Sequence, residues 1–212
     1  MNQRRGRCAR STHLLALLSL LPTGLAAQAG GTVAGVVGGY TTTEVLFRPD
    51  AETDEVGGLL IGAFVDAQTP VEWLSIRAEG AYTQRGGDVL ADAQGLPLNG
   101  GMRTDYLSVT VQARAALTLG RARLHVAAGP TIDQLIRSRL DASLEQLLDR
   151  EHPTVFGVGA GIGIGGWVTA RVFAEIEARI VEGLGDAFSG DFISVRHRST
   201  AIVARVGVPI RR

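Results

Sequence analysis

The chain has 212 residues, which suits one domain of moderate size, and its 21 basic and 21 acidic residues balance. It is 45% hydrophobic with 28 glycines, and this composition excludes a disordered chain. Four arginines and no acidic residue lie in the first 29 residues, so the remainder is net negative. A nucleic-acid partner is therefore excluded on electrostatic grounds.

The amino-terminal segment has the three-part layout of a secretory signal peptide. Arginines precede an apolar run over residues 14–21, and small residues ending in Ala27 and Ala29 follow it. The run of about eight residues is far shorter than the roughly 20 that a spanning helix needs. We expect residues 1–29 to be a signal peptide, cleaved after Ala27 or Ala29, and residues 30–212 to form one domain.

Beyond residue 30, apolar and polar residues alternate with the two-residue period of a β-strand. In segment 105–118, for example, Leu107 and Val109 share one parity while Ser108 and Thr110 share the other. The alternation predicts eight strands, at residues 32–41, 58–68, 73–84, 105–118, 123–135, 154–165, 167–181 and 197–210.

The connections between these segments alternate in length. Long ones rich in Asp, Glu, Gly and Arg cover residues 42–57, 85–104, 136–153 and 182–196. Short ones cover residues 69–72, 120–122 and 165–166. Long loops on one side and tight turns on the other are typical of outer-membrane barrels. The sequence thus predicts an all-β fold, an eight-stranded antiparallel up-and-down transmembrane β-barrel in contact with outer-membrane lipid, with a short helix near residues 140–148.

The parity also predicts which side chains face lipid and which fill the bore. An eight-stranded bore is just wide enough for side chains. We expect the charged parity to pair across it, through Arg77, Arg114, Arg179 and Arg205 with Glu79, Glu175 and Glu177. A bore filled in this way conducts poorly. A thin aromatic girdle near the strand ends would comprise Tyr40, Trp73, Tyr82, Tyr106, Phe156 and Trp167.

An alternative reverses the two faces. A soluble periplasmic β-barrel or sandwich that binds an apolar ligand would show the same alternation, with the aliphatic parity inside. The aliphatic parity is made of small side chains rather than large core fillers, and the charged parity carries both signs. Both features favour the membrane barrel.

Four motifs support a more specific interpretation. They are RAEGAYTQRGG at 77–87, YLSV at 106–109, HVAAGP at 125–130 and VGAGIG at 158–163. In this order and spacing they resemble the PorT-type outer-membrane β-barrel domain family, over most of residues 30–210. The resemblance implies a small eight-stranded barrel in the outer membrane of a Gram-negative bacterium. It also implies, for some members, a link to protein secretion or gliding machinery.

One motif points to catalysis instead. His197 and Ser199 form a His-x-Ser pair on a strand, which resembles the pair of outer-membrane lipid A deacylases. A neighbouring base can turn such a serine into a nucleophile. The parity points both side chains into the bore or loop rim, whereas a lipid substrate requires them outside. We therefore expect no catalytic residue and keep a lipid A deacylase-like hydrolase as the alternative.

The remaining motifs do not predict a cofactor or a metal. Glycines at 157–166 lack the helix of a dinucleotide fingerprint and suit a smooth bore face. Paired Glu175 and Glu177 suit a salt-bridge lattice better than acid/base chemistry. The histidines after the signal, His125, His152 and His197, lack zinc spacing, and the acidic residues Asp50, Glu52, Asp54 and Glu55 lack calcium-loop spacing.

We therefore expect a structural or interaction role, in adhesion, envelope integrity or a secretion assembly. The protein would be neither a catalyst nor an open pore. Its long loops would contact envelope or secretion-machinery proteins.

Overall fold

The computed structural model describes residues 31–48, 53–89, 92–93, 96–97, 100–140, 150–185, 187–189 and 194–210. Among these residues, no helix is long and apolar enough to cross a membrane. The expected signal peptide at 1–29, the expected helix in the loop after residue 140, and Asp50 and Glu52 lie outside them.

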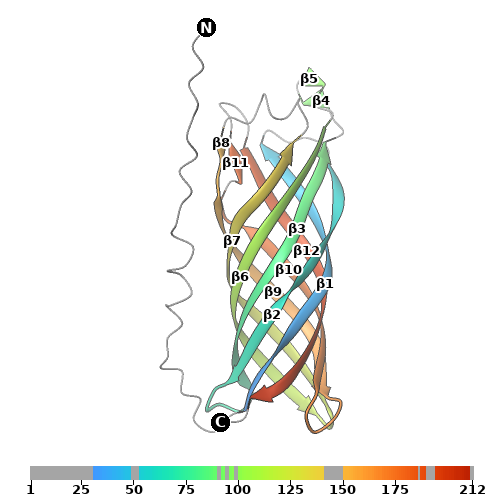
Figure 1. Ribbon diagram of the computed structural model, residues 1–212, viewed down its shortest axis with the longest axis vertical. Coiled ribbons are helices and arrows are strands. Elements are labelled where there is room, and N and C mark those ends of the chain that lie inside the picture. The colour runs from blue at the N-terminus through green and yellow to red at the C-terminus, as the bar shows by residue number, and fades with distance from the viewer. Residues whose placement is uncertain are drawn as a thin grey trace.

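The described residues form a closed barrel (Figure 1). Its eight long strands are β1 (Thr32–Arg48), β2 (Thr53–Gln68), β3 (Leu74–Val89), β6 (Gly100–Leu119), β7 (Ala122–Leu140), β9 (Thr154–Trp167), β10 (Phe173–Gly183) and β12 (Ser194–Ile210). Four short strands are β4 (Asp92–Ala93), β5 (Leu96–Pro97), β8 (Arg150–Glu151) and β11 (Phe188–Ser189).

Each long strand pairs antiparallel with the next along the chain, and β1 closes the ring against β12. The closing pair runs from Thr32 opposite Ile210 to Arg48 opposite Ser194. Because the ring is closed, none of the long strands is an edge strand with a row of unpaired backbone N–H and C=O groups. The prediction of an eight-stranded antiparallel up-and-down barrel is confirmed.

The turn before β10 was predicted in the wrong place. Gly165 and Gly166 do not turn, since they pair with Glu175 and Ala174 across β9 and β10. The chain turns after Trp167 instead, where the Val168 N–H donates to the Val172 carbonyl over 2.9 Å. The sequence prediction took the two glycines as a turn signal, but in the structure they are the last residues of β9 before Trp167 and pair with β10.

The short turns and the long connections lie at opposite ends of the barrel (Figure 1). The turns at 69–73, 120–121 and 168–172 share one end with Thr32 and Ile210. In the tightest of them Gly120 has a φ of 61°, a conformation that favours glycine. The short strands β4, β5, β8 and β11 lie at the other end. This asymmetry is the one that the alternating connection lengths predicted.

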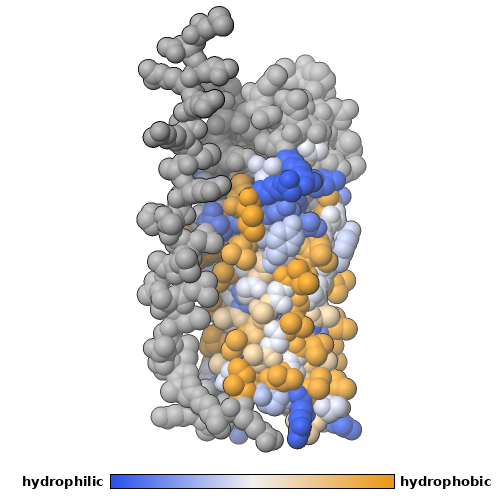
Figure 2. Space-filling view, in the orientation of Figure 1, coloured by the Kyte–Doolittle hydropathy of each residue, from blue (hydrophilic) through white to orange (hydrophobic). Residues whose placement is uncertain are grey.

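The barrel is apolar outside, as the parity predicted. Aliphatic side chains such as Ile162, Ile202 and Val36 are more than 60% exposed. Figure 2 shows apolar side chains over the middle of the wall and hydrophilic ones gathered near the end with the long connections. The soluble alternative required the aliphatic parity to line an interior, so this arrangement overturns it.

One aromatic residue was misplaced. Tyr106 was expected in the outer girdle, but its ring is fully buried in the bore. The reason is its parity, which is opposite to that of Leu107, a lipid-facing residue. Trp73 and Trp167, by contrast, lie on the outer surface at the turn end.

Candidate functional site

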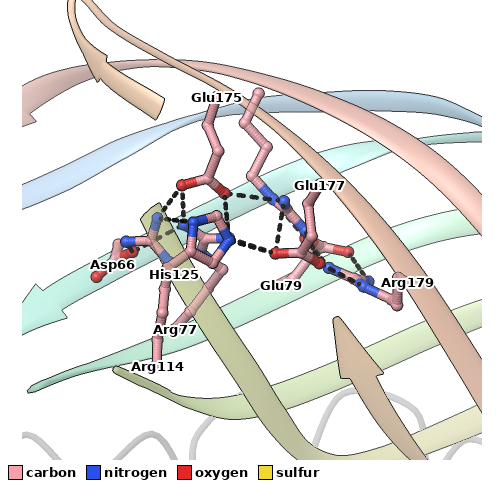
Figure 3. A network of polar contacts seen from close by, with 9 residues as sticks. Asp66, Arg77, Glu79, Arg114, His125, Glu175, Glu177 and Arg179 are labelled. Atoms are coloured by element: carbon pink, nitrogen blue, oxygen red, sulfur yellow. Dashed lines mark hydrogen bonds and ion pairs between the residues drawn. The ribbon is translucent and has the colours of Figure 1, made fainter. Parts of the chain in front are cut away.

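The most distinctive feature of the interior is a cluster of charged side chains across the half of the bore nearer the short turns, which we call the bore lattice (Figure 3). Its members come from six strands and are Asp66, Arg77, Glu79, Arg114, His125, Glu175, Glu177, Arg179 and Arg205. All nine are buried, and the most exposed, Asp66, is only 9% accessible. Four guanidinium groups face four carboxylates, so the lattice is electrically balanced when His125 is neutral.

Arg77 on β3 lies at one centre of the lattice. Its two terminal nitrogens donate to both oxygens of Glu175, over 2.7 and 3.1 Å. The second nitrogen also reaches Asp66 on β2 over 2.9 Å. The guanidinium carbon lies 5.3 Å from the centre of the Phe64 ring. A bidentate pair of this kind fixes direction as well as charge.

Glu79 lies at the other centre, two residues along the same strand face. It accepts from Arg179 on β10 and from Arg205 on β12, each over 2.7 Å. Arg179 also donates from Nε to Glu177 over 2.9 Å, and Arg205 donates to Glu175 over 3.1 Å. These ion pairs thus connect β3 across the bore to β10 and β12, which are not its neighbours in the sheet.

His125 on β7 links the two centres. Arg114 donates to its Nδ1 over 3.0 Å, so this nitrogen must be the acceptor and carries no proton. The proton is therefore on Nε2, which donates to Glu177 over 3.1 Å. Arg114 also donates to Asp66 and to Glu175. The geometry selects the neutral imidazole, which keeps the lattice balanced.

His125, Glu175 and Glu177 also have the composition of a metal site, since one ligand atom from each lies within 4.8 Å of the others. The carboxylate oxygens, however, already accept hydrogen bonds from Arg77, Arg179 and Arg205. A divalent cation placed there would lie among guanidinium groups. We therefore assign the three residues to the lattice.

The glycines of β9 make room for these side chains, as expected for a smooth bore face. A Cβ on Gly163 would lie 2.4 Å from the His125 ring and 2.5 Å from the Ile176 carbonyl oxygen. One on Gly161 would lie 3.1 Å from the Glu177 carboxylate. Gly161 and Gly163 are thus steric requirements of the lattice.

A second polar layer lies between the lattice and the long connections. Arg85 donates to Asp133 over 2.7 Å, and its guanidinium lies 5.2 Å from the centre of the Tyr106 ring. The edge of that ring faces His197, with 6.1 Å between centroids. Between the two layers lies a cavity of about 30 Å³, which is room for a water molecule. Its lining combines threonine and serine side chains with aliphatic ones and with Glu79, Arg85 and Arg179.

The His-x-Ser pair belongs to this second layer. His197 and Ser199 are 3% and 5% exposed, and both point into the bore. The Ser199 hydroxyl lies 3.0 Å from the Thr43 hydroxyl. An acyl chain on the outer surface is separated from both by the barrel wall.

The seven charged residues predicted for the bore all lie there and pair as expected. Sequence reasoning missed Asp66 and His125, and it missed the Arg85–Asp133 pair. The sequence could have placed His125 in the bore, because it lies between Leu124 and Val126, which face the lipid. For Asp66 the signal was weak, because Leu60 and Phe64 face inward on β2 while Leu59 and Ile61 face outward.

No family model and no curated protein matches this sequence. Among solved structures, the outer membrane protein OprG from Pseudomonas aeruginosa matches with a TM-score of 0.62 and 11% identity, covering 88% of this chain and 98% of OprG. Neisserial surface protein A matches with a TM-score of 0.53 and 12% identity, covering 84% of this chain and 97% of that one. Outer membrane protein W of E. coli matches with a TM-score of 0.50 and 14% identity, covering 86% and 99%.

At such identities the likeness shows the fold, which is that of small outer-membrane barrels. The apolar wall adds a physical argument, because a closed barrel with this much exposed aliphatic surface needs hydrocarbon around it. The chain is an eight-stranded β-barrel of the outer membrane.

Proposed function

We propose that this protein is a structural or interaction component of the outer membrane, with a bore closed to solutes and no catalytic activity. The observation that supports it most is the bore lattice. Nine side chains from six strands meet across the bore, and every one of them is buried. A solute crossing here would have to separate several short ion pairs at once.

The interaction role rests on the asymmetry of the barrel. The short turns offer little surface at one end, whereas the other end carries the long connections and the short strands β4, β5, β8 and β11 (Figure 1). In outer-membrane barrels the long loops face the outside of the cell. Adhesion, envelope integrity and a place in a secretion assembly all use such a surface, and the resemblance to the PorT-type family favours the last of these.

The absence of catalysis is part of the proposal. The alternative, a lipid A deacylase-like hydrolase, needs His197 and Ser199 on the lipid side of the wall. Both side chains point into the bore instead, and the Ser199 hydroxyl is engaged with Thr43.

Conductance of the purified protein in planar lipid bilayers tests the closed bore. The protein is refolded in detergent, and its shift in gel mobility on boiling verifies folding before it is added. We expect no steady current steps. Regular, ohmic steps from protein that passes the folding check would overturn the closed-bore proposal.

A further inference from the structure

The inner faces of β3 and β6 carry four neighbouring polar side chains, which we call the β3–β6 block. Its members are Ser75 and Arg77 on β3 and Gln112 and Arg114 on β6. In the strand register Ser75 lies opposite Arg114, and Arg77 lies opposite Gln112. Directly opposed residues on one face of a sheet have Cβ atoms about 4.5–5.5 Å apart, so the four side chains are immediate neighbours. None of them is more than 3% exposed.

Every member of the block has a buried polar atom with no hydrogen-bond partner among the residues that the structure describes. These atoms are the Ser75 hydroxyl oxygen, the Nε atoms of Arg77 and Arg114, and both the oxygen and the nitrogen of the Gln112 amide. Buried polar groups are nearly always hydrogen-bonded, to protein or to ordered water, because an unpaired one costs its full desolvation. The gathering of such atoms in one block points to a ligand.

The bore lattice does not supply the missing partners. Arg77 and Arg114 both turn their terminal nitrogens toward Glu175 and Asp66 (Figure 3). The Nε atom, where each side chain joins its guanidinium group, receives no such partner.

The block cannot satisfy itself either. The two Nε atoms, the Gln112 amide nitrogen and the Ser75 hydroxyl all donate, whereas only the amide oxygen and the hydroxyl oxygen accept. Donors therefore exceed acceptors, and the block needs a partner that accepts hydrogen bonds. The amide oxygen also needs a donor, so the partner must be able to do both.

Glycines leave room beside the block. Gly129 on β7 follows next to Gln112, since a Cβ on Gly129 would lie 2.8 Å from the Gln112 Cα. Gly129 pairs in turn with Gly159 on β9, where a Cβ would meet nothing closer than 3.5 Å. Two successive strands thus bring no side chain into the bore at this level. The cavity between the two polar layers is a different place, because its lining includes no member of the block.

We propose that the β3–β6 block binds ordered water inside the bore. Water oxygens accept from the Nε atoms of Arg77 and Arg114 and from the Gln112 amide, and water hydrogens are donated to the Gln112 oxygen and to Ser75. A buried water makes about three hydrogen bonds, and the block offers both kinds. An anion fits less well, because the guanidinium and carboxylate groups of the lattice already balance, and a further charge there would be buried without a counter-ion. The site needs no path through the lattice, so it stands or falls separately from the closed bore.

The direct test is NMR of the barrel, deuterated at carbon and refolded in detergent from ordinary water. We expect cross-peaks between water and the side-chain N–H groups of Arg77, Gln112 and Arg114. Opposite signs of the NOE and the ROE distinguish bound water from proton exchange. A Gln112→Met variant identifies the amide signals. No such cross-peak, in protein whose gel mobility shifts on boiling, would overturn the proposal. So would a shift of these N–H signals when gluconate replaces chloride, because an anion would then occupy the block.

Urea unfolding in phospholipid vesicles adds a readout that depends on sign. Gln112→Met keeps the size of the side chain and removes the amide. If water joins the amide to its neighbours, the equilibrium constant of unfolding should rise about two- to tenfold, as for the loss of one hydrogen bond. An amide buried without a partner would give the reverse, because its removal relieves a desolvation cost.

The matched control is Gln84→Met, which removes an exposed amide that donates to the Tyr82 hydroxyl. Its equilibrium constant of unfolding should change by less than about twofold, as for other surface substitutions. A Gln112→Met variant as stable as the wild type, or more stable, would contradict the proposal.

Discussion

Replacing Glu175 with glutamine isolates the electrostatic part of the bore lattice, because the side chain keeps its size and loses its charge. Glu175 accepts hydrogen bonds from Arg77, Arg114 and Arg205. The variant leaves four guanidinium groups facing three carboxylates in a region closed to solvent. Breaking a buried ion pair by removing one partner costs about 3–5 kcal/mol. We expect a loss of this size in the free energy of unfolding.

Urea unfolding in phospholipid vesicles measures the loss. The only two tryptophans, Trp73 and Trp167, lie on the outer surface, 58% and 40% exposed, so their fluorescence reports departure from lipid. The matched control is Ile176→Val, the neighbouring lipid-facing position on β10. Its free energy of unfolding should change by no more than about 0.5 kcal/mol, as for other surface substitutions.

A double variant makes the test sharper. Arg77→Met combined with Glu175→Gln restores the balance of charge, with three guanidinium groups and three carboxylates. We expect the double loss to be smaller than the two single losses together by about 0.5–3 kcal/mol, as for residues in direct contact. A loss below about 1 kcal/mol for Glu175→Gln, or strict additivity, would refute the description of the lattice as a coupled unit.

Further predictions follow from neighbouring contacts. Gly163→Ala should destabilise the barrel by about 1–3 kcal/mol in the same urea assay, because the new methyl group meets the His125 ring and the Ile176 carbonyl. Gly159→Ala, on the same face of β9, should change the free energy of unfolding by less than about 0.5 kcal/mol, since its Cβ would meet nothing closer than 3.5 Å; equal losses would contradict the steric argument. The charge-balanced variant Arg77→Ser/Glu79→Ser/Glu175→Ser/Arg179→Ser should give current steps in planar bilayers where the wild type gives none, and a silent, folded variant would show that other side chains close the bore. Ser199→Ala should leave lipid A acylation unchanged in cells that make the protein, and altered acylation by mass spectrometry would revive the hydrolase alternative.

The barrel fold could be predicted because the same two sequence patterns recur from strand to strand. Each strand shows the same two-residue alternation, and each pair of neighbours is joined by a connection whose length marks the end of the barrel at which it lies. The orientation of side chains followed from the same parity. It placed Arg77, Glu79, Glu175 and Glu177 inside correctly, and applied consistently it would have placed Tyr106 there too.

The individual ion pairs of the lattice could not be predicted from the sequence. The parity of a residue shows whether its side chain faces the bore, but not at which level along the barrel axis it lies. Arg77 and Glu175 are 98 residues apart, and they meet only because the register of every intervening strand brings them to one level. Gly165 and Gly166 show a second limit. A glycine pair can mark a turn or a strand face cleared for a neighbour, and only the packing of Glu175 against β9 distinguishes the two.

The most direct test of the barrel assignment is gel mobility of the protein in fractionated cell envelopes, with and without boiling. A folded, lipid-embedded barrel with its charged side chains inside should appear in the outer-membrane fraction, and its mobility should change on boiling. Recovery in the soluble periplasmic extract, with the same mobility before and after boiling, would contradict the account and mean that the aliphatic faces are buried.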